Sequence, residues 1–128
     1  MPKIICIIDN DPIYRLITRK LIEKSNLFSE MTFYSNGEEG LHGLTHTENL
    51  PDIILLDIEM PVMDGWDFLD EFNQLKTSIH KDIKIYVVSS SILNEDKGKT
   101  SNYPWVSGFI SKPLDLEKLN EIANSASL

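Results

Sequence analysis

The chain has 128 residues, which fits one domain of ordinary size with a real hydrophobic core. Its 41% hydrophobic and 25% charged residues are typical of a folded globular domain and not of a disordered chain. A formal net charge of −8 repels phosphate backbones, so we expect no nucleic-acid partner.

The N-terminal run Ile4–Ile8 is apolar but too short to span a membrane. It continues into acidic residues without the cleavage site of a signal peptide, so we expect a cytoplasmic chain with no membrane partner. Cys6 is the only cysteine, which excludes an internal disulfide and a cysteine metal cluster. Its apolar neighbours predict a buried, inert thiol.

Five short runs rich in β-branched and aliphatic residues predict β-strands. Three of them are almost continuously apolar, which is typical of strands covered on both faces. The runs are Ile4–Ile8, Met31–Tyr34, Ile53–Leu56, Ile83–Val88 and Val106–Ile110.

Apolar residues at helical spacing predict a helix after the first, third and fifth of these runs. The other two connections, Gly37–Glu48 and Asn94–Asn102, have weaker periodicity, and the second is expected to be a short or mobile helix. The three clear apolar stripes are Ile13, Leu16, Ile17 and Leu21; Phe68, Leu69, Phe72 and Leu75; and Leu116, Leu119, Ile122, Ala123 and Ala126.

This alternation of strand and helix predicts an α/β fold, a doubly wound five-stranded parallel sheet with helices on both faces. No linker or repeat divides the chain, so we expect one domain over residues 1–128 and no output domain. In such sheets, reactive groups gather at the carboxyl ends of the strands.

Polar residues follow four of the predicted strands and should therefore meet at one rim of the sheet. A carboxylate can attack phosphorus and form an acyl phosphate if a divalent cation offsets the repulsion between the two anions. Mg²⁺ suits a site with few protein ligands, while a lysine and a hydroxyl can contact phosphoryl oxygens. The rim residues are Asp9, Asn10 and Asp11 after the first strand, Asp57 after the third, Ser89, Ser90 and Ser91 after the fourth, and Lys112 after the fifth.

These rim residues lie in motifs that closely resemble those of bacterial two-component response-regulator receiver domains, of the stand-alone type. The longest motif is residues 51–65, with the sequence PDIILLDIEMPVMDG. The others are Ile7-Ile8-Asp9-Asn10-Asp11-Pro12, Val87-Val88-Ser89 and Phe109-Ile110-Ser111-Lys112-Pro113. The resemblance spans essentially the whole chain and implies a flavodoxin-like strand order of 2-1-3-4-5.

By this resemblance, Asp57 accepts a phosphoryl group from a phosphohistidine on a sensor histidine kinase or a histidine phosphotransfer protein. Mg²⁺ or Mn²⁺ would be held by Asp9, Asn10, the Asp57 carboxylate and the main-chain carbonyl of Glu59. Lys112 would contact the phosphoryl group. The chain would then signal to an unidentified downstream protein, and it would not be an enzyme beyond phosphorylating and dephosphorylating its own Asp57.

The resemblance also assigns a switch and several structural positions. Ser89 is the hydroxyl that moves to the phosphoryl group, and Phe109 is the aromatic residue coupled to it, where the family often has Tyr. The segment Asn94–Asn102 is the expected bistable element, since its sequence has low helix propensity. Pro61, Gly65 and Pro113 shape loops, and Pro113 follows a peptide bond that is cis in the family.

Asn10 departs from the family, which usually has Asp as the second member of its acidic pair. An Asn carbonyl can coordinate a cation but brings no charge, so we expect weaker Mg²⁺ binding. Asp11 would partly compensate if it reached the metal. An equally good interpretation of Asp11 is a helix N-cap, because Asp-Pro is a common helix entry.

Two other functions remain open from the sequence. Residues 9–13 also resemble the Asp-x-Asp opening of haloacid-dehalogenase-like phosphatases, with Asp9 as nucleophile, but this leaves the motif from Asp57 to Gly65 unexplained. A non-phosphorylated pseudo-receiver that acts only as an interaction module would keep the fold, and Asn10 is its sole support.

Two residue groups outside the rim are further candidate sites. His42 and His46 stand at i and i+4 but lack an evident third metal ligand, so a solvated helix face is the favoured interpretation. Tyr103-Pro104-Trp105 is a candidate exposed aromatic patch beside the last strand.

Overall fold

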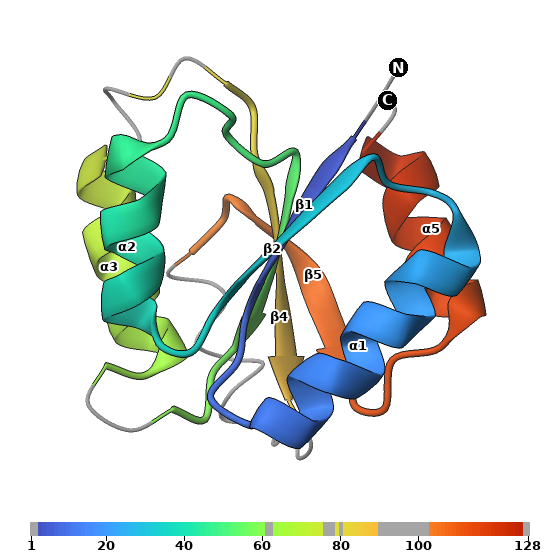
Figure 1. The fold of residues 1–128 in the computed structure, drawn as a ribbon. Coiled ribbons are helices and arrows are strands. Elements are labelled where there is room, and N and C mark those ends of the chain that lie inside the picture. Colours follow the sequence, from blue (N-terminus) through green and yellow to red (C-terminus); the bar gives the residue numbers. More distant parts are fainter. Residues whose placement is uncertain (1–2, 61–62, 76–78, 80, 90–102, 127–128) are drawn as a thin grey trace.

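The computed structural model describes residues 3–60, 63–75, 79, 81–89 and 103–126. Five parallel strands form one sheet in the order β2-β1-β3-β4-β5, which confirms the predicted fold and strand order (Figure 1). The strands are β1 (Ile4–Ile8), β2 (Glu30–Tyr34), β3 (Ile53–Asp57), β4 (Lys84–Ser89) and β5 (Val106–Ser111). The helices are α1 (Pro12–Ser25), α2 (Gly37–His46), α3 (Gly65–Leu75) and α5 (Leu116–Ala126).

The helices cover the sheet in two layers, with α1 and α5 on one face and α2 and α3 on the other (Figure 1). Side chains alternate between these faces along each strand. In β1, Cys6 and Ile8 belong to the core under α2 and α3, whereas Ile5 and Ile7 belong to the core under α1 and α5. The continuous apolar runs therefore serve both faces of a sheet that is covered on each side.

The observed strands end one residue later than the sequence predicts in three cases. Asp57, Ser89 and Ser111 are the last residues of β3, β4 and β5. Asp57 is level with Val88, and Ser89 is level with Ser111, so these strands end at the same edge of the sheet. The side chains of Asp57 and Ser89 are thus held by the sheet ladder itself. The predicted segment Asn94–Asn102, together with Pro61, Ser90 and Ser91, lies outside the described residues.

Helix α1 forms as predicted, but the apolar stripe that predicts it mostly does not face the core. Ile13, Leu16 and Ile17 are 69%, 52% and 52% exposed, and the buried residues of the helix are Thr18 and Ile22. The apolar positions indicated the periodicity correctly but not the buried side. The sequence leaves an exposed apolar surface on α1 instead of a fully packed one.

The start of α3 is fixed by the pair Asp64-Gly65, which forms a cap and a close turn. The Asp64 carboxylate accepts a hydrogen bond from the amide of Asp67 at 2.9 Å. A Cβ atom on Gly65 would lie 2.6 Å from the Cα of Ile58 and 2.9 Å from the main-chain oxygen of Asp57. Only glycine lets α3 approach the segment after Asp57 this closely.

The aromatic residues near β5 are packed and do not form the exposed patch that the sequence suggested. Tyr103 and Trp105 are half-buried against the core. The Tyr103 ring stacks on Trp66, with the ring centres 5.5 Å apart. Cys6 is fully buried, as predicted, and burial raises the pKa of its thiol to about 12. Across the described residues, none of the helices has the length and apolar character that crossing a membrane requires.

Candidate functional site

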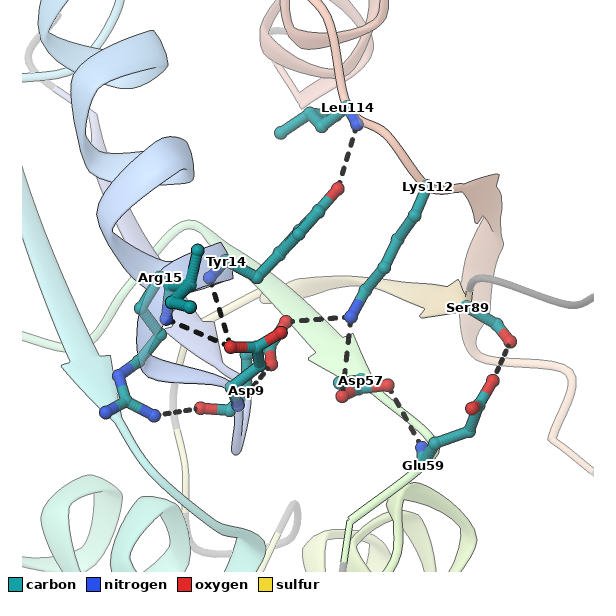
Figure 2. Close-up of polar contacts among 10 residues, drawn as sticks. Asp9, Tyr14, Arg15, Asp57, Glu59, Ser89, Lys112 and Leu114 are labelled. Atoms are coloured by element: carbon teal, nitrogen blue, oxygen red, sulfur yellow. Dashed lines mark hydrogen bonds and ion pairs between the residues drawn. The ribbon is translucent and has the colours of Figure 1, made fainter.

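The predicted rim exists at the carboxyl edge of the sheet (Figure 2). Asp9 follows β1, Asp57 ends β3, Ser89 ends β4 and Lys112 follows β5. Because β1 and β4 are the two neighbours of β3, the first three of these residues come from adjacent strands. Lys112 reaches across from the edge strand toward the centre of the rim.

The ammonium group of Lys112 binds two carboxylates at once. Its Nζ atom lies 3.2 Å from Oδ2 of Asp9 and 3.6 Å from Oδ2 of Asp57. Both aspartates are buried, and the lysine side chain is largely buried as well. Charge pairs shielded from water interact more strongly than surface pairs, so this contact orders the rim.

The other oxygen of each carboxylate is held by the main chain. Oδ1 of Asp9 accepts a hydrogen bond from the amide of Asp11 at 2.9 Å. Oδ1 of Asp57 accepts one from the amide of Glu59 at 3.0 Å. Each carboxylate is therefore oriented from one side by the loop that follows its strand, and it presents Oδ2 to Lys112.

At the rim, two buried carboxylates share the single positive charge of Lys112. Burial raises the pKa of Asp57 to about 6; the amide of Glu59 and the Lys112 ammonium oppose this rise, and Asp9 adds to it. Burial alone would lower the pKa of Lys112, but the carboxylates of Asp9 and Asp57 outweigh it and the pKa is raised. The three groups together carry an excess of negative charge near neutral pH.

The donor set of this rim fits a hard divalent cation. Asp9 and Asp57 supply carboxylate oxygens, and one lysine does not neutralise both. Mg²⁺ takes oxygen ligands and keeps several waters, so it does not need a third acid from the protein. Among the described residues, no three His, Cys, Asp or Glu side chains cluster as a metal group. Asn10, which the resemblance places as the second member of the acidic pair, is exposed.

Asp11 caps α1, the alternative that the sequence left open beside a role at the metal. Its Oδ1 atom accepts from the amides of Ile13 at 3.0 Å and Tyr14 at 3.4 Å. Asp11 also lines the open cleft above Asp57, which has a volume of about 480 Å³. The other lining residues are Asn10, Tyr14, Asp57, Glu59, Lys112 and Pro113.

The two predicted switch residues lie on β4 and β5, the strands beyond β3 in the sheet. Ser89 is fully buried, and its hydroxyl donates to Oε1 of Glu59 at 2.7 Å (Figure 2). Phe109 is half-buried, and its ring meets Trp66 edge-on at 6.4 Å. The carboxylate of Glu59 therefore holds Ser89 in this structure, a contact that the sequence did not indicate.

Tyr14 and Arg15, on the first turn of α1, are two further contributors that sequence reasoning missed. The Lys112 Nζ atom lies 4.2 Å from the centre of the Tyr14 ring, and the Tyr14 hydroxyl accepts from the amide of Leu114 at 2.9 Å. Arg15 donates to the main-chain oxygen of Asp9 at 2.5 Å. The available signal was position alone, because a helix that begins at the rim presents its first turn to the site.

The remaining candidates are Pro113 and the histidine pair on α2. The peptide bond between Lys112 and Pro113 is cis. His42 and His46 are exposed on α2, with ring centres 4.3 Å apart. They belong to no cluster of possible metal ligands within the part of the chain that the structure describes.

Comparison with known proteins places the chain in a family. A model of the response regulator receiver domain matches residues 5–124. The chain is 32% identical over 121 residues to the sensor histidine kinase CheAY of Helicobacter pylori, covering 93% of this chain and 14% of that protein. The chain covers 47% and 55% of two other curated relatives, so it spans about half of their length.

Solved structures give the same answer for the fold. A two-component response regulator from Cytophaga hutchinsonii superposes with a TM-score of 0.90 at 26% identity, covering 99% of this chain and 98% of that one. The receiver domain of the sensor histidine kinase PA1611 from Pseudomonas aeruginosa PAO1 superposes at 0.77 with 16% identity, over 98% and 97% of the two chains. That receiver domain is described with a magnesium ion coordinated in its active site cleft.

The family model covers every strand end that forms the rim, from Asp9 to Lys112. Since it spans nearly the whole chain, the protein belongs to the family of response regulator receiver domains, the phosphoacceptor modules of two-component signalling.

Proposed function

We propose that Asp57 is the phosphoacceptor of this receiver domain and that its donor is a phosphohistidine on a sensor kinase or a histidine phosphotransfer protein. The observation that carries this proposal is the contact of Lys112 with both Asp9 and Asp57. It joins Asp57, a carboxylate that lines the open cleft, to a cation that also binds a second acid. Of the two described aspartates that contact Lys112, Asp57 alone lines this cleft.

In the proposed transfer, a carboxylate oxygen of Asp57 forms a bond to phosphorus as the bond from phosphorus to the histidine nitrogen breaks. The imidazole leaves with the electron pair of that bond. Lys112 offsets the charge of the incoming phosphoryl oxygens, and the amide of Glu59 keeps the carboxylate oriented. Hydrolysis of the acyl phosphate by water later restores the carboxylate.

Mg²⁺ is the cofactor that the donor set supports. We expect Asp9, the side-chain oxygen of Asn10, the Asp57 carboxylate and the main-chain carbonyl of Glu59 to hold it, with Asp11 confined to capping α1. When bound, the ion supplies the positive charge that lets two anions meet. The excess negative charge around Lys112 supports this assignment.

Signalling requires the added charge to favour a second arrangement of the domain. In the described conformation, the Ser89 hydroxyl donates to Glu59. Ser89 must give up this hydrogen bond before it can donate to a phosphoryl group on Asp57. Phe109 packs against Trp66 on α3, so a change of its rotamer would change the packing of that helix.

The exposed apolar surface of α1 is where we place the donor protein. Ile13, Leu16 and Ile17 are exposed on a helix that starts at the cleft, and Leu116 at the start of α5 is 38% exposed. Exposed apolar residues beside a reactive group favour docking of a protein surface. The donor histidine could then reach Asp57 over the first turn of α1.

The alternative functions are not favoured. A haloacid-dehalogenase-like phosphatase would use Asp9 as nucleophile and Asp11 as acid and base. In this structure, Asp9 is buried and bound to Lys112, while Asp11 caps α1. An inert interaction module would not need the buried charge contact of Asp57 with Lys112, which carries a desolvation cost.

Substitution Asp57→Asn should abolish phosphorylation, because the amide is not a nucleophile. Incubation with Mg²⁺ and acetyl phosphate, followed by intact mass spectrometry, should show one added phosphoryl group in the wild type and none in Asp57→Asn. Asp82→Asn, at an exposed aspartate away from the rim, is the matched control and should keep the adduct. An adduct that persists in Asp57→Asn would refute the assignment.

Substitution Asn10→Asp should tighten Mg²⁺ binding, because it restores a charge at the position next to Asp9. We expect a gain of at least about tenfold, since a unit charge near the ion is worth more than the ~1.4 kcal/mol that tenfold requires, even after desolvation. Calorimetric titration with Mg²⁺ measures the affinity. Asn120→Asp adds the same charge at an exposed position of α5 and should change the Mg²⁺ affinity little. Equal affinities for wild type and Asn10→Asp would rule the idea out.

The double substitution Leu16→Ser and Ile17→Ser should slow transfer from a protein donor but not from acetyl phosphate. The protein donor is a histidine-phosphorylated protein that has first been shown to phosphorylate the wild-type chain. We expect a loss of about tenfold or more, because two exposed apolar anchors are removed. A loss of similar size with acetyl phosphate would instead mean that α1 acts on the chemistry, and no loss with either donor would place docking elsewhere.

A further inference from the structure

We propose that Tyr14 is a positioning residue for Lys112, so that the aromatic ring keeps the ammonium group over Asp57 while the phosphoryl group arrives. This inference rests on the proposed function of Asp57 and Lys112. Tyr14 lies in none of the motifs that carry the family resemblance, and it stands on the first turn of α1. Its place in the cleft wall brings it to the reacting groups.

The ring of Tyr14 and the ammonium group of Lys112 are in direct contact. The Nζ atom is 4.2 Å from the ring centre, well within the range of a cation–π interaction. Figure 2 shows the Tyr14 side chain running from α1 toward the segment after β5, beside the side chain of Lys112. Lys112 is therefore bounded by Asp9, Asp57 and an aromatic face.

The hydroxyl of Tyr14 fixes the same segment at a second point. It accepts a hydrogen bond from the main-chain amide of Leu114, two residues after Lys112, at 2.9 Å. One side chain of α1 thus holds both the side chain of Lys112 and the main chain that follows it. The ring contact and the hydroxyl contact are chemically distinct, so substitutions can separate them.

The lysine needs such a restraint because its long side chain has many rotamers. Its Nζ atom is closer to Asp9 than to Asp57, at 3.2 Å against 3.6 Å. Without the ring, the ammonium group could follow Asp9 or turn into the open cleft. With the ring in place, it stays within reach of the Asp57 carboxylate.

A purely structural role for Tyr14 would depend on the hydroxyl, which ties α1 to Leu114. Tyr14→Phe removes that hydrogen bond and keeps the ring, whereas Tyr14→Leu removes both and keeps an apolar side chain. Tyr86→Leu is the matched control, because Tyr86 is a half-buried tyrosine on β4 away from Lys112. Thermal unfolding of all three variants shows which of them fold normally.

The direct readout is the contact between the Tyr14 ring and Lys112, which does not require phosphorylation. In protein carrying ¹³C-labelled lysine, a ring beside the ammonium group shifts the ε-proton signal of Lys112 upfield. We expect this shift to persist in Tyr14→Phe and Tyr86→Leu and to disappear in Tyr14→Leu. A Lys112 signal that is the same in Tyr14→Leu as in the wild type would overturn the proposal.

The second readout is the phosphorylation rate with acetyl phosphate at saturating Mg²⁺. Tyr14→Leu should lower the maximal rate about tenfold with a smaller effect on the half-saturating donor concentration, and Tyr14→Phe should stay within about twofold of the wild type. In a Lys112→Ala background, Tyr14→Leu should cause no further loss, because its effect acts through the lysine. Equal losses in Tyr14→Phe and Tyr14→Leu, or an undiminished loss without Lys112, would reduce Tyr14 to a structural residue.

The proposed function of Asp57 and the role of Tyr14 are contradicted by different results. If the wild type forms no adduct, the proposed function of Asp57 fails and the role of Tyr14 in transfer falls with it. If the wild type and Tyr14→Leu form the adduct at the same rate, only the role of Tyr14 is overturned.

Discussion

The contact of one lysine with two buried carboxylates is the interaction on which the rest of this domain depends. Lys112 comes from the segment after β5, Asp9 from the segment after β1 and Asp57 from the end of β3. These strands are far apart in the sequence, and β5 is separated from β3 by β4 in the sheet. The two apolar cores hold the sheet rigid, so that the rim can keep like charges close together.

Burying these carboxylates together leaves the rim with unfavourable negative charge, and this charge favours the binding of a cation. Burial raises the pKa of Asp57 to about 6, and Asp9 adds to this effect, so a single lysine leaves negative charge uncompensated. A divalent cation relieves that charge, and a phosphoryl group changes it again. The contact between Ser89 and Glu59 lies next to this centre, because the amide of Glu59 binds the carboxylate of Asp57.

Much of this architecture could be predicted from the sequence, because parallel sheets leave a strong pattern. Continuous apolar runs indicated the strands, and the polar residues that follow them indicated the rim that includes Asp57 and Lys112. Side-chain contacts were harder, since they depend on directions that periodicity does not contain. The stripe on α1 predicted a helix whose apolar residues are largely exposed, as Leu16 shows.

The side-chain contacts of Tyr14 and Glu59 escaped the sequence reasoning for the same reason. Each residue has an ordinary place in the sequence, one within an apolar helix and the other in a loop, and each acquires its role from a neighbour that is distant in the chain. Tyr14 meets Lys112, and Glu59 meets Ser89, only after the strands are aligned. Asp11 was ambiguous because the same carboxylate type suits a helix cap and a metal, and the geometry places it as the cap.

The most direct test of the account is the free energy of unfolding of Asp57→Asn and wild type as a function of pH in a metal-free buffer. The folded-state pKa of Asp57 is about 6, above its ordinary value of 3.8, so its contribution to stability is present below the ordinary value and is lost as pH rises through about 6. Asn has no such loss. The account predicts that Asp57→Asn is the more stable protein at pH 7, by about 1 to 2 kcal/mol, and that the gap closes toward pH 4. A variant that is less stable than the wild type at pH 7 would show that Lys112 already satisfies both carboxylates, which would contradict the account.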